Sequence, residues 1–187
     1  IAMSRGSRGY WIAFTDARTY AFSPSSAAPT CGPAGASRSD AAARDFFDRL
    51  NAERAARGLP ALGWDPGLAQ YATDWSRDMS VNGFRHSNLG NLLNGGRFGL
   101  VGENIASGSA GVSAGGLHVA WMHSDGHRSN MLSPGFDLVG IGVYCAPNGS
   151  MFATTSFGRT MGAGPAPSAG TPPVDPVVRP DPGSSTC

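Results

Sequence analysis

The sequence contains no lysine: all fourteen of its basic residues are arginine, and thirteen acidic residues leave a formal charge of only +1. Proteins that bind nucleic acids or anionic membranes usually carry a clear excess of positive charge. The sequence also lacks any run close to the roughly 20 apolar residues that a membrane-spanning helix needs. We therefore expect neither a nucleic-acid partner nor a transmembrane segment.

Cysteine is scarce and widely spaced. The three cysteines are Cys31, Cys145 and Cys187, and no Cys-x-x-Cys spacing is present, so a zinc knuckle or a dithiol redox site is not expected. One disulfide and one spare thiol is the simplest arrangement. We favour a Cys31–Cys145 pair, because it would tie the segment before the main domain to an expected core strand. Cys145–Cys187 is the alternative.

Glutamate and histidine are also rare. The only glutamates are Glu53 and Glu103, and there are four histidines, so a site that combines carboxylates with imidazoles has few candidates. The sequence begins at Ile1 without a basic segment that leads into an apolar stretch, and no signal peptide is visible. This start is consistent with a leader that has been removed or with a fragment of a longer protein.

Proline and glycine mark the boundaries of the chain's regions. Residues 162–187 hold few large apolar side chains, too few to offset the entropy of ordering, and we predict a disordered tail. Residues 24–39 have the same character and form a predicted linker. Before them, residues 9–23 alternate aromatic and small residues around Thr15-Asp16-Ala17, as two short strands joined by a turn would.

The segment 1–23 resembles one unit of the Gly-Tyr-Trp repeats of secreted actinobacterial proteins. A single repeat cannot bury its own faces, so we expect further copies upstream in the parent protein.

The remaining residues, 40–161, are predicted to form one domain of helices followed by a hairpin. Apolar residues at helical spacing, with Ser39 or Asp40, Asp65 and Asp125 as caps, predict helices over 40–57, 66–82, 113–123 and 125–132. Strands are expected over 138–144 and 151–157, joined at Pro147-Asn148-Gly149. The glycine-rich stretch 88–101 is interpreted as a long loop that forms a cleft rim.

Several separated blocks of this domain occur in an order that is more specific than any short motif. They are Leu50-Asn51-Ala52-Glu53-Arg54, Arg85-His86-Ser87, Gly102-Glu103-Asn104-Ile105-Ala106, Trp121-Met122-His123-Ser124 and Gly126-His127-Arg128-Ser129-Asn130. In this order they resemble the bacterial-type CAP domain (SCP/PR-1-like; cysteine-rich secretory protein, antigen 5, pathogenesis-related 1). The resemblance implies an α+β fold: a three-layer α-β-α sandwich with a small antiparallel sheet between helices and a cleft lined by histidines and acidic residues.

The resemblance assigns the pocket positions residue by residue. His86 matches the first pocket histidine, Glu103 the glutamate of the Gly-Glu-Asn block, and His127 the second histidine. Where related domains have a second glutamate three residues after the helix tryptophan, this sequence has Ser124. We place Asn104, Ser124 and Asn130 at the pocket or its rim.

The chemistry of the trio is left open between two interpretations. His86 and His127, with Glu103 as a further candidate ligand, would suit zinc or another divalent cation, because imidazoles and a carboxylate are common ligands of such ions. Alternatively, Glu103 accepts hydrogen bonds and simply fixes the shape of the cleft.

We expect a monomeric, secreted protein, extracellular or cell-wall associated, that binds a small-molecule, lipid-like or cell-wall ligand. A first alternative is a metal-assisted hydrolase of peptide or cell-wall material, with Glu103 as base, His127 as acid and Ser87 or Ser124 as nucleophile. No Gly-x-Ser-x-Gly motif surrounds either serine, so binding is favoured over catalysis. A second alternative is a purely structural extracellular module.

Overall fold

The computed structural model describes residues 2–6, 9–13, 19–22, 37–164, 175–180 and 183–187. Within them the helices are α1 (Asp40–Ala55), α2 (Pro66–Asn82), α3 (Gly90–Leu93), α4 (Ala114–Met122) and α5 (Asp125–Met131). The strands from residue 37 onward are β4 (Ser37–Arg38), β5 (Gly63–Trp64), β6 (Phe98–Gly108), β7 (Leu138–Cys145) and β8 (Met151–Thr160). None of the helices in the described part has the length and apolar character needed to cross a membrane.

The N-terminal region forms a small antiparallel sheet of its own. Strands β1 (Ala2–Gly6), β2 (Gly9–Ala13) and β3 (Thr19–Phe22) pair in that order. The two strands expected within residues 9–23 are therefore confirmed, and β1 is an addition. The expected turn at 15–17 and most of the expected linker lie outside the described residues. The last part of that linker is not a linker, because β4 pairs with β7.

The helices begin where their caps predict. Ser39 accepts a hydrogen bond from the backbone of Ala42 at the start of α1 (3.3 Å), and Asp65 accepts one from Leu68 at the start of α2 (2.8 Å). These bonds satisfy amides that have no partner within the helix. The predicted cap of the last helix is wrong by one residue: Ser124 is its N-cap, and Asp125 already lies in the first turn.

The central sheet has the strand order β4-β7-β8-β6, with β5 added parallel to β7. The expected hairpin is confirmed, although both strands continue further, to Cys145 and Thr160. The expected loop over 88–101 is wrong in two places, because it contains α3 and the start of β6. Residues 102–106 of β6 are buried on both faces, so the sequence shows no polar–apolar alternation that would mark a strand.

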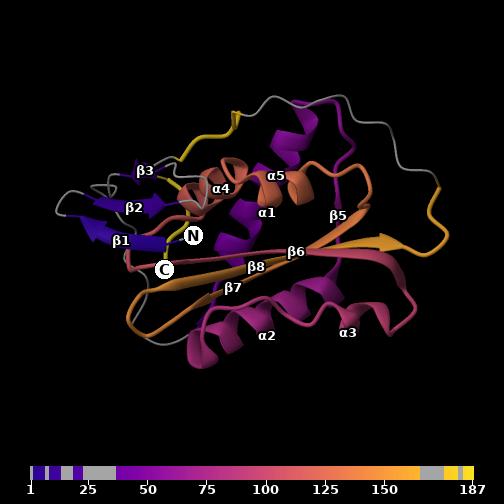
Figure 1. Ribbon diagram of the computed structural model, residues 1–187, viewed down its shortest axis with the longest axis horizontal. Helices are drawn as coiled ribbons and strands as arrows, with labels where there is room; N and C mark the ends of the chain where they lie inside the picture. The colour runs from indigo at the N-terminus through magenta and orange to yellow at the C-terminus, as the bar shows by residue number, and fades with distance from the viewer. Residues whose placement is uncertain (1, 7–8, 14–18, 23–36, 165–174, 181–182) are drawn as a thin grey trace.

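The sheet lies between two helical layers, which confirms the expected α-β-α sandwich. Helix α2 covers one face, and α1, α4 and α5 cover the other (Figure 1). On the second face, Phe46 of α1 packs its ring 4.9 Å from that of Trp121 of α4. Trp121 also donates its indole N–H to the carbonyl of Ile105 (3.1 Å), which fixes α4 to strand β6.

On the opposite face, helix α2 approaches the sheet so closely that β7 needs glycine. A Cβ atom on Gly140 would overlap the backbone of Leu68 and Ala69, and one on Gly142 would overlap the backbone of Thr73. Ser76, one turn further along α2, donates to the carbonyl of Gly142 (2.9 Å). The close approach sets the position of α2 and of the residues that follow it.

Residues 175–180 and 183–187, which we call the C-terminal segment, contradict two predictions. The disulfide joins Cys145 to Cys187 with the Cα atoms 5.4 Å apart, not Cys31 to Cys145; Cys31 lies outside the described residues. The segment is also not a disordered tail where it is described. Thr186 forms a β-bridge with Ser113, and Ser184 is 3% exposed. Residues 165–174 and 181–182 of the predicted tail lie outside the described residues. The prediction of disorder was wrong because it used only the segment's own composition, whereas the polar groups that bind the segment lie on helices far away in the sequence.

We predict that Gly140→Ala destabilises the fold by about 3 kcal/mol or more, because α2 must move to admit a methyl group into a packed layer. The measurement is chemical denaturation of the disulfide-bonded chain. Gly126→Ala in α5 is the matched control: nothing lies within 4 Å of its added Cβ, so the same substitution should be neutral or stabilising by up to about 1 kcal/mol. Equal midpoints for the two variants would contradict the prediction.

Candidate functional site

Three elements bring the predicted trio to one edge of the sheet. His86 follows the end of α2, Glu103 lies in the edge strand β6, and His127 lies in α5. His86 and His127 line the same cavity. Glu103 does not line it but contacts the ring of His86. The fold therefore gathers residues that no sequence spacing connects.

Glu103 fixes the first imidazole. Its Oε1 atom lies 2.7 Å from Nδ1 of His86 and accepts a second hydrogen bond from the backbone N–H of Ser87 (2.9 Å). The Glu103 side chain is only 1% exposed, whereas that of His86 is 62% exposed. Because Oε1 already accepts from Ser87, it acts as an acceptor towards His86 as well, so Nδ1 of His86 carries the hydrogen and Nε2 is left for a ligand. The other carboxylate oxygen, Oε2, is buried without a hydrogen-bond partner.

The second imidazole is held through its backbone. Asn104 donates its side-chain amide to the carbonyl of His127 (3.0 Å), and Asn130 donates to the side chain of Asn104 (2.9 Å) and to the carbonyl of Glu103 (3.2 Å). Burial, together with the nearby charge of His86, lowers the pKa of His127 from 6.5 to about 4. His127 is therefore neutral at physiological pH, and its Nδ1 is buried without a partner.

The cavity beside these histidines has a volume of about 290 Å³. Ile105 and Ala106 of β6, with Leu117, Ala120 and Trp121 of α4, form a mainly apolar wall. The remaining lining residues are Phe84, Arg85, His86, Ser107 and His127. The arrangement suits a small molecule with an apolar body and one polar group, because such sites are typically apolar with a few placed polar atoms.

The predicted rim residues occupy other places. Asn104, Ser124 and Asn130 do not line the cavity; the two asparagines lie behind His127, and Ser124 caps α5. Sequence reasoning missed the apolar wall and gave Trp121 no part in the site, although this residue packs in the core and also lines the cavity. The signal was present: residues 117, 120 and 121 share one face of a helix at i, i+3 and i+4.

The residues of the site do not fit the expected divalent cation. Zinc sites use at least three protein ligands, and no three His, Cys, Asp or Glu side chains in the described part of the chain form a metal-binding group. One oxygen of Glu103 is engaged with His86 and the backbone N–H of Ser87. We therefore assign no step to a metal.

A second group of buried polar residues lies behind α4. Glu53 of α1 and His118 of α4 are both 0% exposed, and their side chains approach within 3.4 Å. Burial is the largest influence on the pKa of both groups. It would raise the pKa of Glu53, but hydrogen bonds from His118, Val178, Val177 and Arg57 outweigh it and lower that pKa to about 2. For His118, burial prevails and lowers the pKa.

Residues 47–157 match the model of the cysteine-rich secretory protein (CAP) family. The chain belongs to this family. The membership confirms the resemblance carried by the Arg85-His86-Ser87, Gly-Glu-Asn and Gly-His blocks. The helices and strands of this CAP domain extend slightly beyond the match, from Asp40 to Thr160.

Bacterial CAP proteins are among the similar chains. The uncharacterized protein YkwD of Bacillus subtilis is 32% identical over 124 residues, which are 62% of this chain and 47% of that protein. A Bacillus anthracis extracellular protein containing an SCP domain is 33% identical, with a TM-score of 0.53 over 64% of this chain and 40% of that one. An outer surface protein of Borrelia burgdorferi, 18% identical, shares the fold with a TM-score of 0.60, covering 67% of this chain and 99% of its own.

This chain spans about half or less of the curated relatives that it matches. The activities of the longer relatives belong to those proteins.

We predict that His127 titrates with a midpoint near pH 4 in the folded protein, because burial and the charge of His86 oppose its protonation. Its unfolded-state pKa of 6.5 is higher, so the unfolded chain binds more protons between these values. Neutral His127 therefore contributes stability that is complete above pH 6.5 and is lost as the pH falls towards 4. An NMR titration of the ring protons measures the midpoint. In His86→Ala it should rise, and an unchanged midpoint there would remove the proposed coupling.

Proposed function

We propose that this CAP domain is an extracellular binding module whose cleft takes a small, lipid-like molecule with one uncharged polar group. The observation that carries the proposal is the cavity itself: an apolar wall from β6 and α4 ends at two imidazoles, His86 and His127. A cell-wall sugar is a poorer fit, because sugars need many hydrogen-bonding partners and this wall offers few.

The chemistry of the two imidazoles favours an uncharged polar group such as a hydroxyl. Glu103 orients His86 so that Nε2 is available, and His127, which is neutral at physiological pH, also lines the cavity. A hydroxyl can donate to one nitrogen and accept from another. A carboxylate would instead approach the buried carboxylate of Glu103.

Two observations support an extracellular location. Disulfides persist mainly in oxidising compartments, and Cys145 is bonded to Cys187. The Bacillus anthracis relative, one third identical over the domain, is itself described as an extracellular protein.

A hydrolase is the second candidate, and the Glu103–His86 contact is the observation that favours it. A carboxylate that orients an imidazole is the usual arrangement of a general base. In this arrangement His86 is the base and Glu103 orients it, whereas the sequence suggested Glu103 as base. Ser87 is next to the pair, and its Oγ is buried without a partner.

The hydrolase candidate predicts that Glu103→Gln lowers turnover of a peptide or muropeptide substrate at least about a hundredfold, because an amide cannot stabilise a charged His86. The assay is a panel of peptides and muropeptides followed by mass spectrometry. Glu103→Asp should restore part of the rate. Turnover that survives Glu103→Gln unchanged would exclude this mechanism, and no turnover by the wild type leaves binding as the function.

The binding proposal predicts that octan-1-ol binds the disulfide-bonded chain and that Ser107→Trp weakens the binding at least tenfold. Ser107 lines the cavity and is only partly buried, so a large side chain there fills the space without disturbing the core. Isothermal titration calorimetry measures both dissociation constants.

The matched control is Ser109→Trp, a partly buried serine of the same region that does not line the cavity; its affinity should stay within twofold of the wild type. Equal affinity of Ser107→Trp and the wild type would refute the assignment of the cleft. Zinc chloride serves as a second probe. If zinc binding is detected by calorimetry and is lost in the His86→Ala, His127→Ala double variant, the ligand of the cleft is a cation and not a lipid-like molecule.

A further inference from the structure

Four charged residues form a stripe of alternating sign along one face of α1 and its C-terminal end. They are Asp45, Arg49, Glu53 and Arg57, each four residues from the next. Within the stripe Arg49 pairs with Asp45 and Arg57 with Glu53, each at 2.5 Å. Residues at this spacing lie above one another on a helix. The stripe therefore offers carboxylates and guanidiniums in turn, at intervals of about 6 Å.

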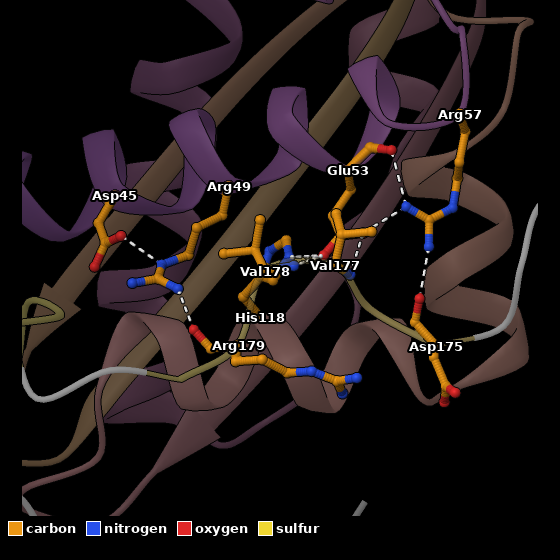
Figure 2. A network of polar contacts seen from close by, with 9 residues as sticks. All are labelled: Asp45, Arg49, Glu53, Arg57, His118, Asp175, Val177, Val178 and Arg179. Carbon is orange, nitrogen blue, oxygen red and sulfur yellow. Dashed lines mark hydrogen bonds and ion pairs between the residues drawn. The ribbon is translucent and has the colours of Figure 1, made fainter.

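The C-terminal segment lies along this stripe and presents its main chain to it (Figure 2). Arg57 donates to the carbonyl of Asp175, and Arg49 donates to the carbonyl of Arg179, both at 2.8 Å. Between them, one carboxylate receives two successive amides: Glu53 accepts from the N–H of Val177 (3.1 Å) and of Val178 (2.8 Å). Two successive N–H groups that converge in this way form a common anion-binding arrangement of the backbone.

From Arg57 to Arg49, the spacing of the stripe matches the spacing of the bound residues 175–179. Four residues of an α-helix, the separation of neighbouring charges in the stripe, rise about 6 Å along the helix axis. Two residues of an open chain advance by roughly the same distance. Carbonyls and amides of the segment therefore meet guanidiniums and carboxylates in turn.

Further along the segment, contacts continue at the start of α4. Asp45 accepts from the hydroxyl of Ser184 (2.7 Å) and from the backbone N–H of Ser185 (3.0 Å). The Ser184 hydroxyl in turn accepts from the N–H of Gly115 (2.6 Å), and the carbonyl of Ser185 accepts from Ala114 (2.8 Å). The segment ends at the disulfide of Cys187.

The side chains of the segment alternate in exposure. Pro176 is buried and Val178 and Pro180 are partly buried, whereas Val177 and Arg179 are exposed. The side chains that point inward are small and apolar. The side chains of Val177 and Arg179 are exposed, and these two residues contact the stripe through their main-chain groups. Recognition thus depends on the main chain and on a Pro-x-Val-x-Pro pattern.

The buried carboxylate of Glu53 in the stripe depends on hydrogen-bond donors from the bound segment. Glu53 is 0% exposed, and the two amides of the segment account for much of the hydrogen bonding that keeps its pKa near 2. A buried carboxylate that loses such partners becomes strongly unfavourable. Removing the segment would take two hydrogen-bond donors, the N–H groups of Val177 and Val178, away from Glu53.

We propose that the Asp45–Arg57 stripe, with the start of α4, is a peptide-binding site that recognises the main chain of an open, proline-containing segment. Residues 175–180 and 183–187 are its resident ligand, and the Cys145–Cys187 disulfide keeps this segment in place. When Cys187 is not bonded to Cys145, the same segment of a second copy competes for the site.

The test uses the full chain carrying Cys187→Ser and a fluorescently labelled synthetic peptide of residues 175–186. Fluorescence anisotropy should show binding to Cys187→Ser at least tenfold tighter than to the disulfide-bonded wild type, whose site is closed. Adding Glu53→Gln to Cys187→Ser should weaken peptide binding at least tenfold. Asp48→Asn, an exposed charge change on the same helix, should leave it unchanged.

A change in the peptide alone provides a test that does not depend on how a protein variant folds. N-methylation at Val178 removes the donated hydrogen and keeps the side chain, and it should abolish binding. N-methylation at Arg179, whose carbonyl is the group that Arg49 contacts, should weaken it far less. The peptide is titrated to millimolar concentration, which matches the effective concentration of a tethered segment. Absence of binding to Cys187→Ser in that range, or equal binding of both methylated peptides, would overturn the proposal.

Discussion

The antiparallel pairing of β6 with β8 is the interaction on which the cleft depends. It places Glu103 and Asn104 side by side in an edge strand, so that their side chains leave the sheet on opposite faces. Glu103 holds His86, which follows the helix on one face, and Asn104 holds His127 in the helix on the other. Two histidines from different layers therefore meet at the sheet edge because one strand carries both of their supports.

Local patterns were enough to predict most helices but not the strand that carries the site. The caps Ser39 and Asp65 act on amides a few residues away, so their effect is visible in the sequence. Strand β6 is buried on both faces around Glu103 and shows no alternation. The positions of His86, Glu103 and His127 came from family resemblance, whereas the cavity wall required the packing of α4 on β6. That the described residues hold no three-residue metal group could not be predicted, because it depends on how side chains from separate elements are placed in space.

The C-terminal segment shows the same limit in another form. Its proline-rich composition predicts disorder when only its own residues are considered, whereas several of the groups that hold it belong to α1, more than a hundred residues earlier. The alternating charges at 45, 49, 53 and 57 were a signal that sequence reasoning missed. A surface stripe of paired charges usually contributes little, and only the structure shows that this one is covered by a main chain.

Helix α4 is shielded from solvent on all sides, because all of its residues, Ala114 to Met122, are buried. One face of it closes the cleft through Leu117, Ala120 and Trp121. The other meets the C-terminal segment through Ala114 and Gly115, and meets Glu53 of α1 through His118. A helix that is packed on both sides cannot be remodelled from one side alone. Substitutions that reshape the cleft through this helix are therefore constrained by what lies against its back, and variation in ligand preference is freer on the strand side, at Ser107, than on the helix.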